Sequence, residues 1–520
     1  MSAPATFLDA DPATAHWRAA APELRRAARL EVPVLTRASR VPPVGRLLVV
    51  VWTFTRALVP WMWRSRRGRY ASRSASIADL SLRMRLAIER LGPTYIKLAQ
   101  IISSGEGLFP VELVTEFKRC RDQVPAEDFA TVRRVLEEDL AGPLEETFDR
   151  VSPSPLAAAS IAQVHAARLA TGEEVVVKVQ RPSVGELVRR DLRVMAWLAP
   201  HLVGRIKVSA LANPPALVEL FAETIVEELD FRMEADNMVE IAGILRELGQ
   251  DGYVVPRPHP ELVTRRVLVM ERLEGFKFDD AAGMREAGID TVAVVRTGMV
   301  AFMEGALVHG VFHGDLHGGN LFVMRDGRTA LLDFGIVGRL TGARRLAFLR
   351  LMLSATTNDV RGQVAALRDL GALPMDTDLD AVIADLGLGQ PTIDPTTLSA
   401  EELVKEVQRV TKALLGYGAR MPKELMLYVK NLVFLDGAIA ALAPDLDLLG
   451  EIANISMLFA QRHGERLGRE LGIDHTAVEI NLDSVKAGFG VEADVDRLTY
   501  RELRERRVLI QRRMRSRVRG

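Results

Sequence analysis

The chain is poor in cysteine and in aromatic residues, and it carries no excess of either charge. Cys120 is the only cysteine among 520 residues, which excludes an intramolecular disulfide or a cluster of thiolate ligands and favours a reducing compartment. The 68 Lys and Arg residues balance the 68 Asp and Glu residues, so no overall basic character points to nucleic acid. Cys120 itself is interpreted as a small packed thiol.

No secretory leader is evident, and no uninterrupted apolar run reaches the roughly 18–20 residues of a membrane-spanning helix. The nearest run, Val44–Trp63, is interrupted by Arg46 and Arg56. This run contains Trp52, Trp61 and Trp63 and is followed by Arg64, Arg66, Arg67 and Arg69. This pattern is typical of a helix at a membrane interface, and equally of an amphipathic helix docked on the protein's own core.

What is present is a globular composition, with 48% hydrophobic and 26% charged residues, in a chain long enough for two or three domains. Residues 1–40 show no sustained period, and we expect a loosely helical or poorly ordered lead-in. Apolar residues at helical spacing predict helices from residue 76 to about 148, including segments near 110–121, 127–139 and 143–148. Pro153 and Pro155 then mark a change to β structure.

The most informative stretch runs from residue 311 to residue 335, VFHGDLHGGNLFVMRDGRTALLDFG. Asp315 and Asn320 lie five apart, and Asp333 opens a DFG sequence thirteen residues after Asn320. This order is typical of phosphoryl transfer, in which the first Asp takes the acceptor proton and the Asn and second Asp hold Mg²⁺. Strands at Leu321–Met324 and Thr329–Leu332 form the hairpin between them. The alternative is a side-chain-capped turn followed by an ordinary hairpin.

A second feature is Lys178, which lies inside the apolar strand expected at Glu174–Gln180, after a first strand at Ile161–Leu169. A lysine there needs a partner for its ammonium, as in kinases, where it binds phosphate oxygens and pairs with a helix glutamate. Glu228 and Glu234, on a long helix expected at about 215–248, are the candidates. The alternative is a lysine on an edge strand that reaches solvent.

The remainder completes a nucleotide-binding domain and a helical one. A strand expected at Val263–Leu273 enters a hinge, where the backbone of Met270–Leu273 is placed to meet an adenine. Beyond it the chain is expected to be helical apart from the hairpin, near 279–286, 290–310, 342–357, 359–370, 378–386, 400–416 and 422–441. The tail from Tyr500 is strongly basic and is either a solvated helix or a second contact for an anionic surface.

From about Ser76 to Ala440 the chain resembles the UbiB/ADCK-type (AarF-like) atypical kinases. AAASIAQVH at 157–165 resembles the family's alanine-rich loop, which takes the place of a glycine-rich phosphate loop. EELDFRMEADN at 227–237 resembles its ExD and EAxN pattern, and HGDLHGGN and DFG its catalytic and metal loops. The resemblance implies that the backbone of four residues covers the ATP phosphates: Ala157, Ala158, Ala159 and Ser160.

The family also carries a Lys-x-Gly-Gln motif on a helical extension that folds over the active site. The corresponding stretch here is IKLAQ, in which Lys97 and Gln100 match and Ala99 stands where glycine is usual. The resemblance therefore implies an α+β, bilobal protein-kinase-like fold with an N-terminal all-helical extension over the active site. We expect a lead-in with the candidate interface helix at 1–75, the extension at 76–152, an N-lobe at 153–274, a C-lobe at 275–445 and a C-terminal helical region at 446–520.

The resemblance implies an ATP-binding, Mg²⁺-dependent kinase or ATPase that supports isoprenoid quinone or membrane lipid metabolism. Asp315 and Lys178 would be catalytic, Asn320 and Asp333 would bind Mg²⁺, and water or a small or lipid-like molecule would accept the phosphoryl group. Implied partners are a membrane lipid or isoprenoid-quinone precursor and a biosynthetic protein complex, with no nucleic acid. Two alternatives are a nucleotide-gated lipid-binding scaffold with little catalysis and a soluble small-molecule phosphotransferase. We expect a cytoplasmic protein associated peripherally with the inner face of the cell membrane.

Overall fold

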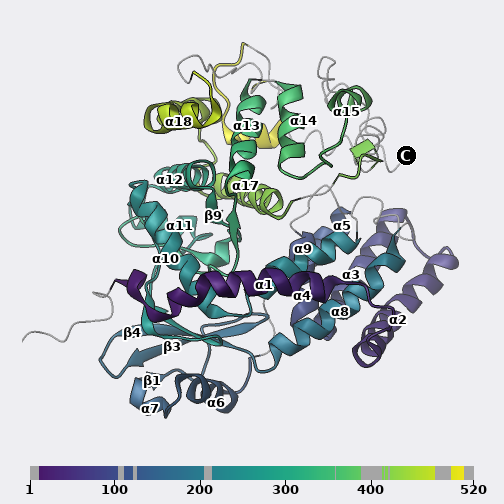
Figure 1. Ribbon diagram of the computed structural model, residues 1–520, viewed down its shortest axis with the longest axis vertical. Helices are drawn as coiled ribbons and strands as arrows, with labels where there is room; N and C mark the ends of the chain where they lie inside the picture. The colour runs from purple at the N-terminus through teal and green to yellow at the C-terminus, as the bar shows by residue number, and fades with distance from the viewer. Residues whose placement is uncertain are drawn as a thin grey trace, which may run out of the picture. The chain divides into compact units, whose positions relative to one another are not determined.

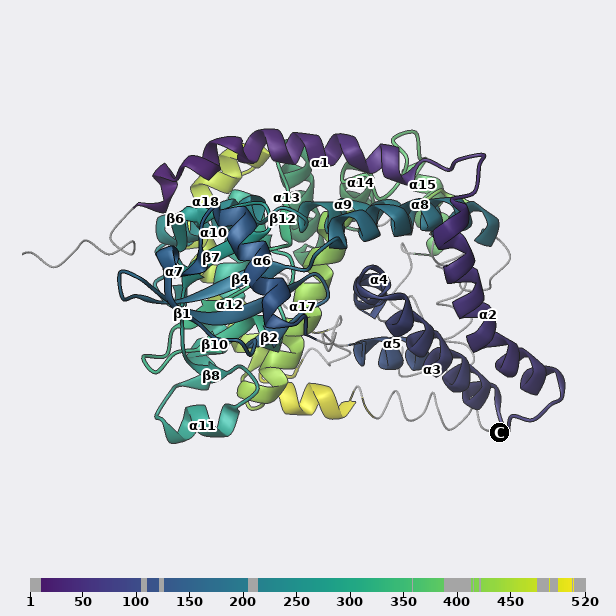
Figure 2. The same cartoon turned by 90° about the horizontal axis from the view of Figure 1, so that it is seen from below.

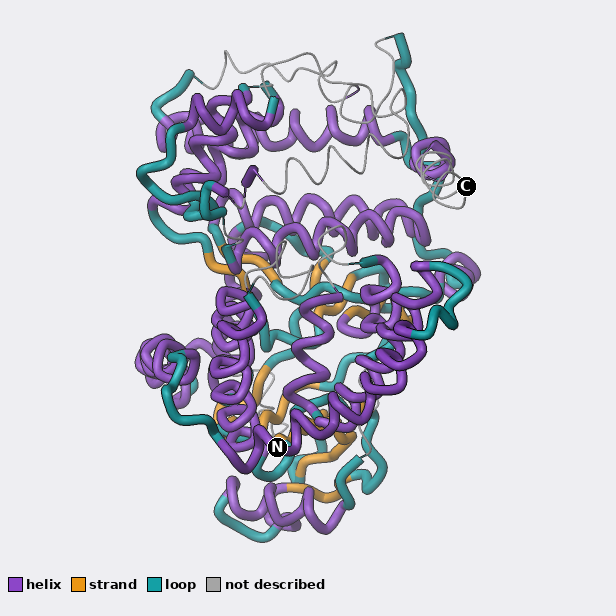
Figure 3. The backbone as a smooth tube through the Cα atoms, turned by 90° about the vertical axis from the view of Figure 1, so that its right-hand side faces the viewer, coloured by secondary structure: helices purple, strands orange, loops and turns teal. Residues whose placement is uncertain are grey.

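The fold was analysed in a computed structural model, which describes residues 11–103, 110–120, 126–203, 214–357, 359–387, 413–414, 416–419, 422–474, 486, 494–506 and 508. The chain divides into two compact units. The first unit contains residues 1–240, 255–273 and 333–336, and the second contains residues 241–254, 274–332 and 337–520. Helices predominate in the chain, and the strands form short sheets (Figure 3).

The first unit begins with helices and then builds an antiparallel sheet. Its helices are η2 (Pro12–Thr14), η3 (His16–Ala20), α1 (Ala21–Thr36), α2 (Val44–Arg66), α3 (Arg73–Leu91), α4 (Pro93–Ser103), α5 (Val111–Lys118), α6 (Phe129–Leu140), α7 (Leu144–Thr147), α8 (Val184–Leu202), α9 (Pro214–Glu227) and α10 (Phe231–Glu247), which continues into the second unit. Its strands are β1 (Phe148–Val151), β2 (Ala157–Ala158), β3 (Ala162–Leu169), β4 (Glu174–Gln180), β6 (Pro258–Val263) and β7 (Val267–Glu271). They are ordered β1-β3-β4-β7-β6, with β2 paired to β3. Figure 1 labels β1, β3 and β4 of this sheet.

One face of this sheet packs on α6. The side chains of Val175, Val177 and Val179 on β4 and of Val267 and Val269 on β7 are buried in one cluster with apolar residues of α6. Because side chains alternate along a strand, the residues between these valines project from the opposite face of β4. The alternation therefore assigns one face of β4 to the core and the other to the polar chemistry described below.

The second unit combines helices with two small sheets. Its helices are α11 (Ala281–Glu286), α12 (Thr291–Glu304), the π-helical η5 (Gly305–His309), η6 (Gly318–Asn320), α13 (Ala343–Thr356), α14 (Val360–Asp369), α15 (Leu379–Leu386), α17 (Lys423–Leu442) and α18 (Leu448–Leu471). One sheet has the order β5-β11-β10-β8, from β5 (Tyr253–Val254), β11 (Thr329–Leu331), β10 (Leu321–Val323) and β8 (Phe276–Lys277). The other pairs β9 (Val311–His313) with β12 (Val337–Arg339).

Several expected elements are confirmed and others are wrong. The hairpin β10–β11 is confirmed, with Gly327 at φ 87° in its turn, as is the strand pair β3–β4. Of the two alternatives for residues 1–40, the poorly ordered lead-in is wrong for the part that α1 occupies, because α1 is a helix of 16 residues. The single helix expected at 215–248 is wrong as well, because the chain breaks between α9 and α10. The helix expected at 400–416 and most of the basic tail lie outside the described residues.

Helix α2 is the candidate interface helix, and most of it is exposed. Arg46, near its start, forms a bidentate ion pair with Asp191 of α8, whose side chain is fully buried, while Trp52 and Trp63 are exposed. The guanidinium carbon of Arg67 lies 3.7 Å from the Trp63 ring centroid. By length and composition alone, three helices of the described residues reach what a membrane crossing needs, at Val44–Arg66, Thr291–His309 and Lys423–Leu442. The sequence criterion, which required an apolar run without any charged residue, was therefore too strict to identify these helices.

Candidate functional site

Lys178 is the centre of a charged cluster in the first unit. It lies on β4 between Val177 and Val179 and so projects from the sheet face opposite their core. Its ammonium Nζ lies 2.7 and 2.9 Å from the two carboxylate oxygens of Glu234 and 3.2 Å from Oδ2 of Asp333. Lys178 and Glu234 are both buried, so each supplies the charge that the other needs. A buried strand lysine is thus joined to the DFG aspartate.

Glu234 is therefore the partner of Lys178, and Glu228 has a different one. Glu228 lies at the break between α9 and α10, and its Oε1 is 2.8 Å from the ammonium of Lys97 on α4. A Cβ atom built on Gly335 would lie 3.4 Å from Cγ of Glu228, so Glu228 borders the DFG segment. The two glutamates left open by the sequence thus divide between two lysines.

The motif residues Ala99 and Gln100, also on α4, make contacts other than those of Lys97. Ala99 is fully buried in α4, so its methyl group fits where the family usually has glycine. Gln100 donates from Nε2 to the carbonyl oxygen of Cys120 at 3.5 Å. Burial raises the pKa of the Cys120 thiol to about 12, which agrees with a packed and unreactive cysteine.

The charges of this cluster shift the pKa values of its members. Burial opposes the ammonium of Lys178, but the carboxylates of Asp333 and Glu234 outweigh burial and raise its pKa. Burial raises the pKa of Glu234 to about 7, although Lys178 acts in the opposite direction. Two carboxylates share one cation here, so one of them is held close to protonation until further positive charge arrives.

Helix α10 also holds the DFG backbone. The N–H of Phe334 donates to Oε1 of Glu234 at 3.4 Å, and its carbonyl oxygen accepts from Nδ2 of Asn237 at 2.8 Å. Glu234 and Asn237 are three residues apart and lie on one face of the helix. Asp333 caps the same turn, accepting from the Gly335 N–H at 2.9 Å. The position of Asp333 is therefore tied to that of α10.

The alanine-rich stretch forms a small hairpin. Ala157 and Ala158 form β2, paired with Val164 and Gln163 of β3, and the N–H of Ala159 donates to the Ala162 carbonyl at 2.8 Å. The Ala159 N–H is thus already used within the hairpin, which reduces the set of amides expected to cover phosphates. Ser160 is buried in the turn.

Arg181 fixes this hairpin, a role that the sequence analysis missed. Its side chain is buried, donates from Nε to the carbonyl oxygen of Ala159 at 3.1 Å, and pairs with Glu127 at 2.9 Å. The N–H of Glu127 in turn donates to the side chain of Gln163. An arginine directly after a strand was the available signal.

The two residues predicted for the hinge, Met270 and Leu273, lie in different surroundings. Met270 lies within β7, opposite Val176 of β4 and Pro258 of β6, so its backbone is inside the sheet. Leu273 follows two residues after the end of β7. Among the hinge residues, Leu273 is thus better placed than Met270 to offer backbone groups to a base.

The catalytic-loop residues lie in the second unit. Asn320 donates from Nδ2 to the carbonyl oxygen of Asp315 at 3.0 Å, which turns the amide oxygen of Asn320 the other way. Nδ1 of His313 accepts from the N–H of Asp315 at 3.1 Å, and Nδ1 of His317 accepts from the N–H of Gly319 at 3.1 Å. Both histidines therefore cap turns of the loop.

Two functional candidates from α17 were missed in the sequence. The ammonium of Lys430 contacts Oδ1 of Asp315. Asn431 is fully buried, accepts from the N–H of Leu316 at 3.1 Å and donates to the carbonyl oxygen of His313. Adjacent residues of one helix thus hold the loop and place a cation on its aspartate. They lie about 115 residues from Asp315, so no local pattern links them.

Each unit carries an oxygen donor of the kind that suits Mg²⁺ better than a transition metal. Asp333 and Asn320 present a carboxylate and an amide oxygen, the ligand types that Mg²⁺ prefers. Within the described part of the chain, no group of three or more His, Cys, Asp or Glu side chains is gathered as a metal site. Mg²⁺ is commonly held by one or two protein carboxylates together with substrate phosphates.

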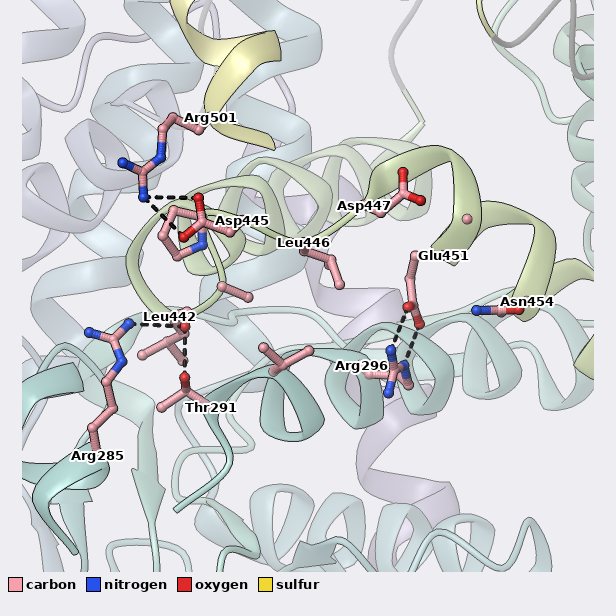
Figure 4. A pocket seen from close by; sticks show the side chains of 14 residues that line it. Arg285, Thr291, Arg296, Leu442, Asp445, Leu446, Asp447, Glu451, Asn454 and Arg501 are labelled. Carbon is pink, nitrogen blue, oxygen red and sulfur yellow. Dashed lines mark hydrogen bonds and ion pairs between the residues drawn. The ribbon is translucent and has the colours of Figure 1, made fainter. Parts of the chain in front are cut away.

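A pocket of about 620 Å³ in the second unit is a different feature (Figure 4). Two ion pairs join residues that line it, Arg296 with Glu451 at 2.6 Å and Arg501 with Asp445 at 2.9 Å. Arg285 and Thr291 both donate to the carbonyl oxygen of Leu442. Among the described residues, those lining it include none that the motifs single out. Its polar groups stabilise the local packing.

Comparison with known proteins agrees with this geometry. Residues 119–367 match the family model described as the ABC1 atypical kinase-like domain. An uncharacterised protein of Mycobacterium tuberculosis is 33% identical over 496 residues, which cover 88% of this chain and 96% of that protein. The chain belongs to the UbiB/ADCK family of atypical kinases. Its fold is thus that of a kinase-like ABC1 domain with mixed helices and sheets.

Other members of the UbiB/ADCK family show the same similarity. A probable protein kinase UbiB of Pseudomonas putida (strain W619) is 33% identical over 401 residues, which cover 76% of this chain and 72% of that protein. An uncharacterised aarF domain-containing protein kinase of Arabidopsis thaliana, described as chloroplastic, is 33% identical over 400 residues, covering 71% and 73%. The matched family segment contains Lys178, Glu234, Asp315 and Asp333 but neither Lys97 nor Lys430.

Proposed function

We propose that the protein binds ATP with Mg²⁺ and transfers the terminal phosphoryl group to water or to a small or lipid-like acceptor. The observation that carries the proposal is the cluster of the buried Lys178 and Glu234 with the partly exposed Asp333, with distances of 2.7 and 3.2 Å from Nζ. A buried lysine joined to a helix glutamate and a DFG aspartate is the arrangement that kinases use for nucleotide phosphates. Membership of the UbiB/ADCK family supports the same reading.

In this proposal each residue has a separate task. Lys178, oriented by Glu234, binds phosphate oxygens, while Asp333 and Asn320 hold Mg²⁺, which neutralises charge on the phosphates. Asp315 takes the proton of the attacking water or hydroxyl group. Lys430 touches Asp315 and so adds positive charge at the catalytic loop. Catalysis would then rest on positioning and charge stabilisation.

The deciding experiment is Mg²⁺-dependent phosphate release by the purified protein, with and without liposomes of anionic phospholipid. Asp333→Asn should abolish turnover because it removes a charged metal ligand. Asp326→Asn is the matched control, since it makes the same change in the exposed turn of the same hairpin and should leave turnover intact. A wild-type protein that neither binds nor hydrolyses MgATP would contradict the proposal.

A second candidate is a nucleotide-gated scaffold with little catalysis. The ion pair between Lys97 and Glu228 favours it, because it places a cation of the helical extension beside the DFG segment. In that reading MgATP binds but is not turned over under either lipid condition. The phosphate-release experiment separates the two candidates when it is combined with a binding measurement.

We further propose that α2 contacts a membrane and that the acceptor is a lipid or an isoprenoid-quinone precursor. Only 17% of its most apolar window is buried, against 67% for the window at Thr291–His309. Exposed Trp52 and Trp63, with Arg56 and Arg67 over their rings, are suited to the headgroup region of anionic lipid. Co-flotation with anionic liposomes should be lost in Trp52→Ser/Trp63→Ser and retained in Trp197→Ser. A soluble phosphotransferase would not float in any form.

A further inference from the structure

The first helices of the chain pack against other helices of the first unit. We call η3 and α1, residues His16–Thr36, the strap. Trp17 at its beginning is buried and donates from its indole N–H to the carbonyl oxygen of His259 at 3.3 Å. Glu31 near its end pairs with Arg189 of α8 at 2.5 Å. Between these anchors α1 runs along α9 and α8 (Figure 2).

The strap delivers two arginines, Arg18 of η3 and Arg25 of α1, to a single carboxylate of α10. Nε of Arg18 lies 3.0 Å from Oδ1 of Asp236, and the terminal nitrogen of Arg25 lies 2.5 Å from Oδ2. The side chain of Asp236 is only 7% exposed. A carboxylate this deeply buried depends on its cations, so the position of α10 and that of the strap are linked.

Arg25 also touches the residue that holds the DFG segment. Its terminal nitrogen donates to Oδ1 of Asn237 at 2.9 Å, and Nδ2 of Asn237 donates to the carbonyl oxygen of Phe334 at 2.8 Å. Both bonds use the same amide group, so the first fixes the orientation that the second requires. A continuous path of polar contacts therefore leads from the strap to the backbone next to Asp333.

We propose that Arg18 and Arg25 are positioning residues, and that the strap sets the position of α10 and of the DFG segment through Asp236 and Asn237. The strap would thereby position two residues of the charged cluster around Lys178, namely Glu234 on α10 and Asp333, without contacting the nucleotide itself. The consequence for catalysis rests on the function proposed above. The positional coupling itself does not, because it concerns contacts within the first unit alone.

Amide hydrogen exchange on the full-length protein tests the coupling. Arg25→Gln and, separately, Asp236→Asn should speed exchange in residues 231–240 and 333–336 by about 2- to 30-fold, the range expected of residues that couple two sites. Exchange in β3 and β4 should not change. Arg29→Gln is the matched control, because it removes an exposed arginine of the same helix. Arg25→Lys, which keeps a cation for Asp236 and a donor for Asn237, should restore part of the slow exchange at both segments.

Two results would overturn the proposal. One is unchanged exchange at 333–336 in both single variants. The other is an equal rise across the sheet, because a strap that only adds stability would affect the whole unit alike. MgATP turnover is measured in parallel. We expect kcat to fall in Arg25→Gln and Asp236→Asn, while their thermal unfolding midpoints stay close to that of Arg29→Gln. If the wild type fails to bind MgATP, the proposed function fails, whereas the exchange result still decides the role of the strap.

Discussion

The ammonium of Lys97 lies 2.8 Å from Oε1 of Glu228, beside the backbone that carries Asp333. Two lysines of the first unit thus neutralise three carboxylates around the DFG segment, since Lys178 serves Glu234 and Asp333. Charge balance in this cluster therefore depends on Lys97, a residue of α4.

Removing Lys97 should therefore strengthen the binding of a divalent cation. In Lys97→Met the carboxylate of Glu228 loses its cation and adds negative charge near Asp333. We expect the dissociation constant for Mn²⁺, a spectroscopic substitute for Mg²⁺, to fall by about 2- to 30-fold. Titration followed by electron paramagnetic resonance measures it. Arg90→Met, which removes an exposed cation of α3, should have no effect, and an unchanged or weaker Mn²⁺ affinity in Lys97→Met would refute the prediction.

The raised pKa of Glu234 predicts a pH-dependent stability. Its folded-state pKa of about 7 lies above the ordinary value of 4.5, so the folded protein keeps this proton where the unfolded chain has lost it. The free energy of unfolding should therefore fall as pH rises between these two values and level off above them. Denaturant unfolding measured from pH 4.5 to pH 8 tests this. Glu234→Gln should flatten the slope, whereas Glu247→Gln, an exposed site on the same helix, should retain it.

Lys430 offers a prediction for the catalytic loop. Its ammonium contacts Oδ1 of Asp315 and so places positive charge beside the residue proposed to take the acceptor proton. We expect Lys430→Met to lower kcat for MgATP by about 100-fold, with KM changed much less, and Lys430→Arg to recover part of the rate. Lys423→Met, at the start of the same helix, is the control. Equal losses in the two methionine variants would show that Lys430 acts only through the folding of α17.

The pair of Arg46 and Asp191 predicts a large effect on stability. Asp191 is fully buried and burial raises its pKa, so it relies on the two hydrogen bonds from Arg46, at 2.6 and 3.2 Å. Arg46→Met should lower the free energy of unfolding by about 3–5 kcal/mol, because it leaves a buried charge alone. Adding Asp191→Leu should recover most of the loss. Arg56→Met, exposed over Trp52, should cost under about 1 kcal/mol, and additive effects of Arg46→Met and Asp191→Leu would contradict the pairing.

The parts of the site that the sequence predicts are those with local spacing. Asp315, Asn320 and the hairpin before Asp333 lie within 25 residues, and turn chemistry at Gly327 determines their geometry. Lys178 is recognisable because a charged residue interrupts a strand of valines. These features can be predicted from the sequence because they depend on residues that are close together in it.

Local spacing in the sequence does not decide whether Glu228 or Glu234 is the partner of Lys178. Helical periodicity continues through Glu228, Leu229 and Asp230, yet the chain breaks there. The break is set by distant packing, since Leu229 and Phe231 are buried and the N–H of Phe231 donates to the carbonyl oxygen of Arg265. Tertiary contacts override helical preference in this case.

The same limit applies to Arg25 and Lys430. Arg25 meets Asn237 across 212 residues of chain, and Lys430 meets Asp315 across 115. The buried positions of α1 lie at helical spacing, but two of the four are small alanines, so the pattern is weak in the sequence; they are Ala21, Ala28, Val32 and Leu35. Only the folded chain brings such partners together.

The cations that face the motif residues come from outside the segment that the family model matches. A recombinant fragment of residues 119–367 would keep the lysine, glutamate and aspartates of the motifs but lose Arg18, Arg25, Lys97 and Lys430. Its site would be more negative than that of the intact protein, and the carboxylates it exposes would attract divalent ions without discrimination. Nucleotide assays and inhibitor screens on this protein should therefore use the whole chain, because a trimmed domain would present a different electrostatic target.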